Sequence, residues 1–190
     1  MLKSELREIY LNRRKSLSDD EVKELSYQIF QNFISEFSLK EGQSLHCFLP
    51  IQKFKEIDTF LFINHFWEIG VNVFVPKVAG NSLLSIPFTS STLLEKNKWD
   101  ILEPKENEED ICHFDMVLTP LLYCDEKGNR IGYGKGFYDA FFKKINADCL
   151  KVGLSYFPPF ESIDDVFSID VPVDYLVSPS GILSFFGKRS

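Results

Sequence analysis

The residues of this chain that are best suited to chemistry are concentrated in one run, residues 128–142, which reads GNRIGYGKGFYDAFF. Three of its glycines stand at alternate positions: Gly132, Gly134 and Gly136. Glycine lets a ligand approach the backbone N–H groups closely, and a helix that begins after them adds the positive end of its dipole. Arg130 and Lys135 add positive charge, so the run predicts a phosphate-binding loop. Asp139 could hold Mg²⁺, which proteins commonly bind through one or two carboxylates plus phosphate oxygens.

This run differs from two standard nucleotide-binding loops. A Walker A loop requires G-x-x-x-x-G-K-[ST], whereas five residues separate Gly128 from Gly134 here and Gly136 stands in the Ser/Thr position. The dinucleotide fingerprint G-x-G-x-x-G fails because Phe137 stands where its third glycine belongs. The residues therefore favour neither a P-loop NTPase nor a classical NAD domain. A turn in which glycine simply permits positive φ is the structural alternative.

Composition and charge narrow the class of protein. The chain has 190 residues, enough to bury a sizeable core in one domain, and 44% of them are hydrophobic. Its net charge of -7 argues against a nucleic-acid partner, because such proteins usually carry a basic face. The N-terminal segment contains charged residues from Lys3 onward. The longest apolar stretches of the chain are far too short for a membrane span. We expect a cytoplasmic protein, a monomer that binds small molecules and contacts no membrane.

The cysteines predict neither a zinc site nor a redox dithiol. They are widely scattered and contain no C-x-x-C pair: Cys47, Cys112, Cys124 and Cys149. We expect them to be reduced and partly buried.

Helices and strands are expected to alternate along most of the chain. Apolar spacing predicts helices over 2–16 and 57–69, and a capping box at Ser18 and Glu21 starts a helix that runs to about Phe37. A further helix should begin near Phe137, and residues 160–167 should form a short helix or turn. The expected strands are 44–50, 71–76, 83–88, 115–120, 151–156 and 174–179.

This alternation predicts an α/β fold. The arrangement should be a single-domain three-layer sandwich, spanning residues 1–190, with a mostly parallel central sheet and helices on both faces. Pro87 argues that the strand over 83–88 lies at an edge, because proline cannot donate to a central ladder. Residues 105–112 are acidic and are expected to form a solvated loop.

The run N-R-I-G-Y-G-K-G-F-Y-D, together with other landmarks, resembles the 5-formyltetrahydrofolate cyclo-ligase family, also called methenyltetrahydrofolate synthetase. The landmarks stand in the family's order: K-x-x-x-R at residues 3–7, E-I-D-T at 56–59, V-P-K at 75–77, W-D-I-L-E-P at 99–104, D-M-V-L-T-P at 115–120 and P-V-D-Y-L-V at 172–177. The resemblance spans nearly the whole chain. The glycine signature is specific, whereas the other landmarks would be weak alone.

The resemblance implies a reaction. It is the ATP- and Mg²⁺-dependent cyclisation of 5-formyltetrahydrofolate to 5,10-methenyltetrahydrofolate, giving ADP and phosphate. ATP would phosphorylate the formyl oxygen and N10 of the folate would then attack. A protein serving this chemistry mainly positions the reactants and stabilises charge on the moving phosphoryl group.

The resemblance also implies roles for individual residues. Arg130 and Lys135 would be catalytic, countering the charge of the triphosphate. The ATP-binding residues would be Lys3, Arg7, Arg130, Gly132, Tyr133, Gly134, Lys135, Gly136, Phe137 and Tyr138. The folate would contact Leu49, Glu56, Trp99 and Tyr138. The magnesium ligands would be Asp139 and Asp174.

Plainer interpretations exist for several of these residues. Lys3 and Arg7, four apart on one helix face, could simply belong to a solvated helix. Asp174 could be a turn residue and Trp99 a core residue. Residues 51–55 make the segment before Glu56 longer than is usual in the family, which leaves the placing of that glutamate open. Two other functions stay open: a non-catalytic relative that binds folate or nucleotide, and a phosphotransferase acting on another metabolite.

Overall fold

The computed structural model describes residues 1–98, 100–105 and 111–187 and contains one seven-stranded mixed sheet. The strand order is β11-β10-β9-β6-β1-β2-β3. The five central strands pair in parallel, whereas β3 and β11 run antiparallel at the two edges. The α/β class and the mostly parallel sheet are therefore confirmed.

The strands of this sheet are β1 Ser44–Cys47, β2 Asn72–Ala79, β3 Ser82–Pro87, β6 Met116–Pro120, β9 Leu150–Leu154, β10 Tyr175–Ser178 and β11 Gly181–Ser184. Two small hairpins lie outside it: β4 Leu94–Lys96 with β5 Leu102–Pro104, and β7 Tyr123–Cys124 with β8 Arg130–Ile131. The helices are α1 Lys3–Lys15, α2 Asp19–Glu36, the 3-10 turn η1 Gln52–Phe54, α3 Phe60–Glu68 and α4 Phe137–Lys144.

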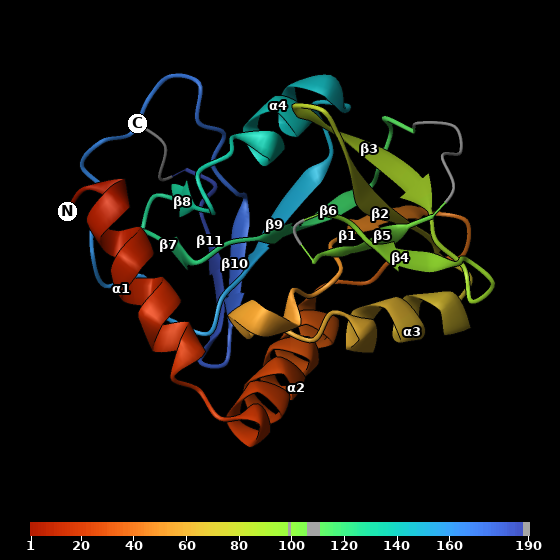
Figure 1. The fold of residues 1–190 in the computed structure, drawn as a ribbon, viewed down its shortest axis with the longest axis horizontal. Coiled ribbons are helices and arrows are strands. Elements are labelled where there is room, and N and C mark those ends of the chain that lie inside the picture. The colour runs from red at the N-terminus through yellow and green to blue at the C-terminus, as the bar shows by residue number, and fades with distance from the viewer. Residues whose placement is uncertain (99, 106–110, 188–190) are drawn as a thin grey trace.

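The helices cover both faces of the sheet, as expected. Figure 1 shows α2 and α3 below it and α4 above it, which makes three layers. The larger core lies on the α2–α3 side, where Phe33, Phe62 and Phe66 pack against the sheet. A second core lies under α4, around Phe114 and Phe141. No helix among the described residues is long and apolar enough to cross a membrane.

Local sequence signals fixed several boundaries. Ser18 Oγ accepts a hydrogen bond from Glu21 N at 3.1 Å, and Glu21 Oε2 accepts one from Ser18 N at 2.7 Å, so the capping box that starts α2 is confirmed. α4 begins at Phe137, and β3 is an edge strand as Pro87 indicated. All four cysteines are free thiols, and Cys47, Cys124 and Cys149 are buried.

Other expectations need correction. The helix predicted from residue 57 begins only at Phe60, because η1 and an extended stretch precede it. Residues 160–167 form bends, with no helix. The edge strand β11 and both hairpins were not predicted, because strands of two to four residues carry little periodicity. Of the acidic stretch 105–112, residues 106–110 lie outside the described part of the chain.

α1 takes a position that its sequence did not reveal. It lies beside the small hairpin β7–β8 at one end of the molecule, away from the two faces of the sheet (Figure 1). Leu6 and Tyr10 are buried there, as the apolar stripe indicated, but Leu2 is 48% exposed. Arg14, a basic residue of the same helix, is only 4% exposed.

The strand order creates a switch point between β1 and β6. From β1 the chain passes through α3 to β2 on one side, whereas β6 lies on the other side of β1 and leads through α4 to β9. In doubly wound sheets, ligands bind in the crevice outside the carboxyl ends of strands at such a point. Residues 48–56 follow β1, and the glycine loop follows β6 by way of β7 and β8.

Candidate active site

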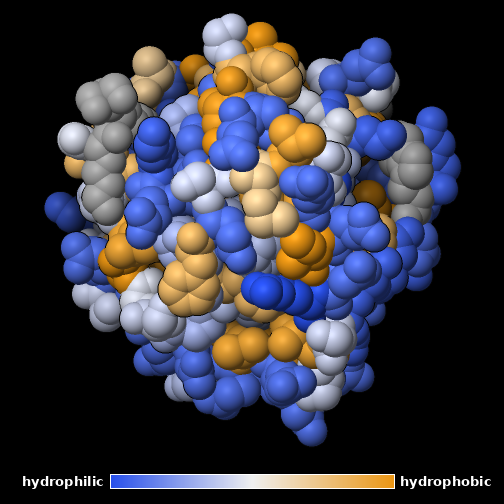
Figure 2. Space-filling model, turned by 90° about the vertical axis from the view of Figure 1, so that its left-hand side faces the viewer, coloured by the Kyte–Doolittle hydropathy of each residue, from blue (hydrophilic) through white to orange (hydrophobic). Residues whose placement is uncertain are grey.

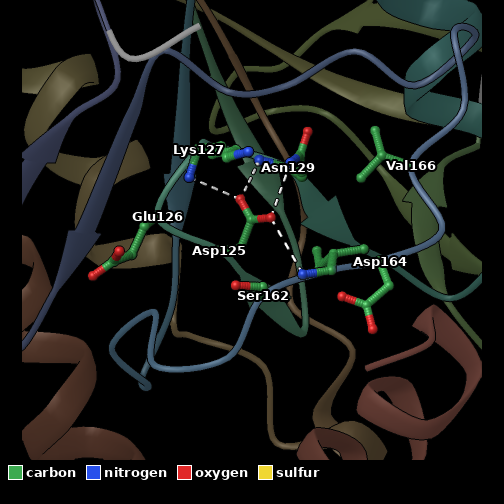
Figure 3. Close-up of a pocket in the computed structure, with 8 residues that line it drawn as sticks. Asp125, Glu126, Lys127, Asn129, Ser162, Asp164 and Val166 are labelled. Carbon is green, nitrogen blue, oxygen red and sulfur yellow. Dashed lines mark hydrogen bonds between the residues drawn. The ribbon is translucent and has the colours of Figure 1, made fainter. Parts of the chain in front are cut away.

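The glycine loop is held in place by a turn around Asp125, which joins β7 to β8. Asp125 Oδ1 accepts hydrogen bonds from Lys127 N at 2.9 Å and Asn129 N at 3.0 Å, and its Oδ2 accepts from Asn129 Nδ2 and Ile163 N. These residues line a surface pocket of about 790 Å³ (Figure 3). Through these hydrogen bonds the Asp125 carboxylate holds the turn in one conformation. Asp125 therefore fixes the position of β8, the strand from which the glycine loop starts.

The loop itself uses glycine for backbone conformations that other residues rarely adopt. Gly134 has φ +83° and Gly136 has φ +69°. Gly136 is the N-cap of α4, and no side chain of the described residues caps that helix end. The first N–H groups of α4 therefore point towards the loop without a side-chain acceptor, as a phosphate-binding helix end requires.

α1 docks directly onto this loop. Arg7 Nε donates to the carbonyl oxygen of Gly132 at 2.9 Å. A Cβ at Gly134 would lie 3.3 Å from Arg7 Cζ, so the close approach depends on glycine there. Lys3 Nζ lies 2.5 Å from Asp170 Oδ2, in the segment before β10, and 5.1 Å from the centre of the Phe167 ring. The structure thus brings the predicted ATP residue Arg7 to the glycine loop, whereas Lys3 contacts the segment before β10.

Arg130 and Asp139, one on each side of the loop, form an ion pair. Arg130 Nη2 lies 2.7 Å from Asp139 Oδ1, which also accepts from Val171 N at 3.0 Å. Burial lowers the pKa of the Arg130 guanidinium, and the neighbouring Asp139 opposes that shift. Lys135, by contrast, is exposed at the tip of the loop. One cation is therefore prearranged and the other is open to solvent.

The two predicted magnesium ligands lie in different settings. Asp139 stands in the first turn of α4, beside the loop, and only its Oδ1 takes part in the hydrogen bonds described above. Asp174 is buried and its Oδ2 accepts from Lys151 N at 2.8 Å, which clamps the starts of β9 and β10 together. No cluster of three or more His, Cys, Asp or Glu side chains suited to a metal occurs among the described residues. The donors fit a cation held by Asp139 and mainly by phosphate oxygens.

Glu56 is buried at the other side of the site. Its Oε2 accepts from Ile51 N at 2.8 Å, and its Oε1 accepts from the hydroxyl of Tyr133 at 2.7 Å. The 51–55 segment before it forms η1 and ends at Lys55 in the left-handed region at φ 52°, so this segment folds back on itself. Burial raises the pKa of Glu56, and Arg14 opposes that rise.

Tyr133 connects the glycine loop with Glu56. Its backbone belongs to the loop, its hydroxyl bonds to Glu56, and its ring centre lies 5.1 Å from that of Phe54. Arg14 Nη2 donates to the same hydroxyl. The resemblance implied a nucleotide role for Tyr133 and a substrate role for Glu56, and the structure puts these two residues in direct contact.

The other predicted substrate residues lie in different surroundings. The Tyr138 hydroxyl is buried and has no hydrogen-bond partner among the described residues, so it is available to a ligand. Burial, followed by the charges of Cys47 and Glu56, raises its pKa. Leu49 is buried in the larger core, and Phe137 packs against the core under α4. Trp99 lies outside the described residues.

Arg14 is a residue of this site that the sequence reasoning missed. It lies 3.8 Å from Glu56 Oε1, and its side chain is 5% exposed. A hint was present in the spacing, because Arg14 follows Tyr10 and Leu6 at intervals of four and so shares their helix face. Its positive charge, by contrast, favoured a position on the solvent-exposed face of the helix.

The sheet is doubly wound, and a glycine loop, a helix N-terminus and several cationic side chains lie near its switch point. This combination is typical of α/β proteins that bind phosphorylated ligands. Residues 1–179 match the 5-formyltetrahydrofolate cyclo-ligase family. The chain therefore belongs to that family of enzymes.

Similar proteins agree with this assignment. The 5-formyltetrahydrofolate cyclo-ligase of Escherichia coli K12 is 28% identical over 178 residues, which cover 90% of this chain and 96% of the relative. The mouse 5-formyltetrahydrofolate cyclo-ligase is 30% identical over 153 residues, covering 75% of this chain and 72% of the relative. The solved structure of Aquifex aeolicus 5,10-methenyltetrahydrofolate synthetase has a TM-score of 0.75 and 29% identity, and covers 100% of this chain and 96% of that chain.

Proposed function

We propose that this enzyme catalyses the ATP- and Mg²⁺-dependent cyclisation of 5-formyltetrahydrofolate to 5,10-methenyltetrahydrofolate, with release of ADP and phosphate. The observation that supports it best is the hydrogen bond from Tyr133 in the glycine loop to Glu56. This contact joins a phosphate-binding element to a buried carboxylate within one site. A reaction that phosphorylates one substrate with another requires such adjacency.

The glycine loop is the proposed binding site for the triphosphate. Lys135 is exposed at its tip, and Arg7 holds its backbone through Gly132. Arg130, paired with Asp139 in this structure, would exchange that carboxylate for a phosphate oxygen. Lys3 would likewise leave Asp170 for the nucleotide. These exchanges keep each cation paired, so little charge is left uncompensated at any stage.

Glu56 and Tyr138 are the proposed contacts for the pterin. The N–H edge of a pterin offers paired donors, which a carboxylate can accept. Glu56 is held by Ile51 N in a fixed direction, and the Tyr138 hydroxyl, which has no partner in the described part of the chain, supplies a second polar group. To admit the ring, Tyr133 must give up its hydrogen bond to Glu56. Leu49 and Trp99 stay predictions for the apolar part of this subsite.

The chemistry follows from the poor leaving ability of a formamide oxygen. The formyl oxygen attacks the γ-phosphorus and ADP leaves, which converts that oxygen into a phosphate ester. N10 then attacks the formyl carbon and loses its proton, and the carbon–oxygen bond breaks to release phosphate. Arg130 and Lys135 stabilise the charge that spreads over the phosphoryl oxygens, and the loop backbone orients them.

Asp139 is the proposed protein ligand for magnesium, and Asp174 is its predicted companion. The bound cation would neutralise charge on the β- and γ-phosphate oxygens. Asp139 lies in the first turn of α4, on the loop side, where it can serve this purpose once Arg130 turns to the phosphates. Asp174 would in addition have to keep or release its bond to Lys151 N.

The decisive measurement is ring closure followed by absorbance. Purified protein mixed with Mg²⁺, ATP and 5-formyltetrahydrofolate should produce the absorbance of methenyltetrahydrofolate together with ADP. Omission of ATP or addition of a chelator should abolish the signal. A well-folded protein that binds folate in calorimetry yet forms neither product would instead be a non-catalytic relative. Turnover of ATP with a different acceptor would identify another phosphotransferase.

Three accompanying expectations stay predictions. Residues 1–190 should act as one domain, the protein should be monomeric, and it should be cytoplasmic. Sedimentation of the purified chain tests the second of these directly, because a dimer would double the apparent mass.

A further inference from the structure

A buried arginine accompanies the proposed substrate carboxylate. Arg14 comes from the last turn of α1, and Glu56 follows η1, so tertiary folding alone brings them together. Both side chains are nearly inaccessible, at 5% and 3% exposure. Burial of two ionisable groups is costly unless they compensate one another, so the pair needs an explanation beyond ordinary core packing.

The two residues line a small cavity. Its volume is about 10 Å³, close to the space that one water molecule needs, and Phe48, Ile57 and Leu121 are among its apolar lining residues. Arg14 Nε is buried and has no hydrogen-bond partner among the described residues. The cavity lies between the chain segments that leave β1 and β6, which is the switch point of the sheet.

The other contacts of Arg14 also belong to the site. Its Nη2 donates to the Tyr133 hydroxyl, which in turn donates to Glu56, and its Nη1 donates to Leu121 O at 3.3 Å. We propose that Arg14 is a positioning residue for Glu56, which fixes the direction and the charge of the carboxylate that receives the pterin. This inference rests on the proposed function, because it takes Glu56 to be the folate contact.

Charge balance supports this role. The titratable groups that face Glu56 are Arg14 from α1, Tyr133 from the glycine loop, Tyr138 from α4 and Tyr156 after β9. Burial raises the pKa of each of these tyrosines, so all three are neutral near pH 7. Arg14 is the cation of this group, and it opposes the rise that burial imposes on the pKa of Glu56.

Kinetics of three single variants test the proposal. Arg14→Met should raise the KM for 5-formyltetrahydrofolate by about tenfold or more and leave the KM for ATP within about twofold, because the lost interaction lies on the folate side. Arg14→Lys, which keeps the charge and loses the planar fork, should fall between. Arg13→Met is the matched control, because Arg13 is the exposed neighbour on the same helix. Its KM values should equal those of the wild type.

A stability measurement tests the charge coupling between Arg14 and Glu56 and does not depend on enzyme activity. Without Arg14, the pKa of Glu56 rises further, so the folded protein loses stability as pH rises through that value. The Tm deficit of Arg14→Met relative to wild type should therefore be larger at pH 8 than at pH 5. Arg13→Met should show no such trend. A deficit that is independent of pH would overturn the assigned charge coupling.

A double variant separates positioning from general packing. If Arg14 acts through Glu56, then Arg14→Met should add little to the folate KM of Glu56→Gln. Full additivity would overturn the proposal. If Arg14→Met does not fold, Arg14→Lys decides, since a wild-type folate KM in that variant contradicts a positioning role. A wild-type protein without ring-closing activity would refute the proposed function, whereas folate affinities by calorimetry would still report on Arg14 and Glu56.

Discussion

Two arginine–carboxylate pairs flank the glycine loop, and they are built differently. Arg130 and Asp139 are in direct contact at 2.7 Å, with the carboxylate 23% exposed. Arg14 and Glu56 are 3.8 Å apart, with the carboxylate 3% exposed, and the Tyr133 hydroxyl bridges them. The first pair lies beside the proposed phosphate site, and the second contains the proposed pterin contact Glu56.

The difference teaches how each pair can respond to a ligand. In the first pair the arginine is nearly buried but the carboxylate is partly open to solvent, so the proposed exchange of Asp139 for a phosphate oxygen keeps Arg130 paired. A fully buried pair leaves an uncompensated charge if either member is lost, and this makes it a rigid reference for the substrate. The loop backbone and Tyr133 lie between the two pairs, so occupancy of one subsite can affect the other.

The largest effect is expected at the proposed phosphate-binding side, at Asp139 of the first pair and at Lys135 of the loop. Asp139→Ala and Lys135→Ala should each lower kcat by about a hundredfold or more, because the first removes the proposed magnesium ligand and the second a cation proposed to stabilise the phosphoryl group. Circular dichroism should show that both variants keep the fold. The control is Lys143→Ala, because Lys143 is exposed in the last turn of α4, the helix that contains Asp139. Activity that survives both substitutions would show that the loop was wrongly assigned.

A reciprocal pair of variants sharpens the division between the two subsites. Arg130→Met should raise the KM for ATP by about tenfold and leave that for folate nearly unchanged, whereas Glu56→Gln should do the opposite. Initial rates with each substrate varied in turn give the four values. If both variants raise both KM values equally, the two pairs serve one undivided site.

Substitution within the loop should have a smaller effect, visible in stability. Gly134→Ala should cost about 1–2 kcal/mol, because alanine is disfavoured at positive φ, and its Cβ would press on the Arg7 guanidinium. Gly132→Ala is the matched comparison, since a Cβ there meets no atom within 4 Å. Urea unfolding of the two variants measures the difference. Equal losses would mean that the docking of α1 does not depend on Gly134.

The smallest effect is expected at a buried group that belongs to neither pair. His46 is fully buried beside Phe114 and Phe141, its two ring nitrogens have no partner among the described residues, and burial lowers its pKa to about 3. His46→Leu should raise stability by up to about 1 kcal/mol, because it removes an unsatisfied polar group at similar volume. Thermal unfolding at pH 7 measures this change. A lower Tm would indicate that His46 has a partner essential to the fold.

Much of the architecture could be predicted because its signals are local. The capping box at Ser18 and Glu21, the glycines before Phe137 and Pro87 at an edge each act through the backbone of a few neighbouring residues. The alternation of strands and helices indicated a mostly parallel sheet with both faces covered. The short hairpins escaped prediction because β7 and β8 contain only two residues each.

By itself, the sequence determined the proposed phosphate-binding run of this protein. Arg130, Lys135 and Asp139 stand within one run, so their proximity follows from chain connectivity. Tertiary structure alone decided the other side. Arg14 joins Glu56 because α1 crosses the end of the sheet and the 51–55 segment folds back, and Tyr133 meets them from the loop. Such contacts depend on how distant elements pack, which no local pattern of residue types encodes.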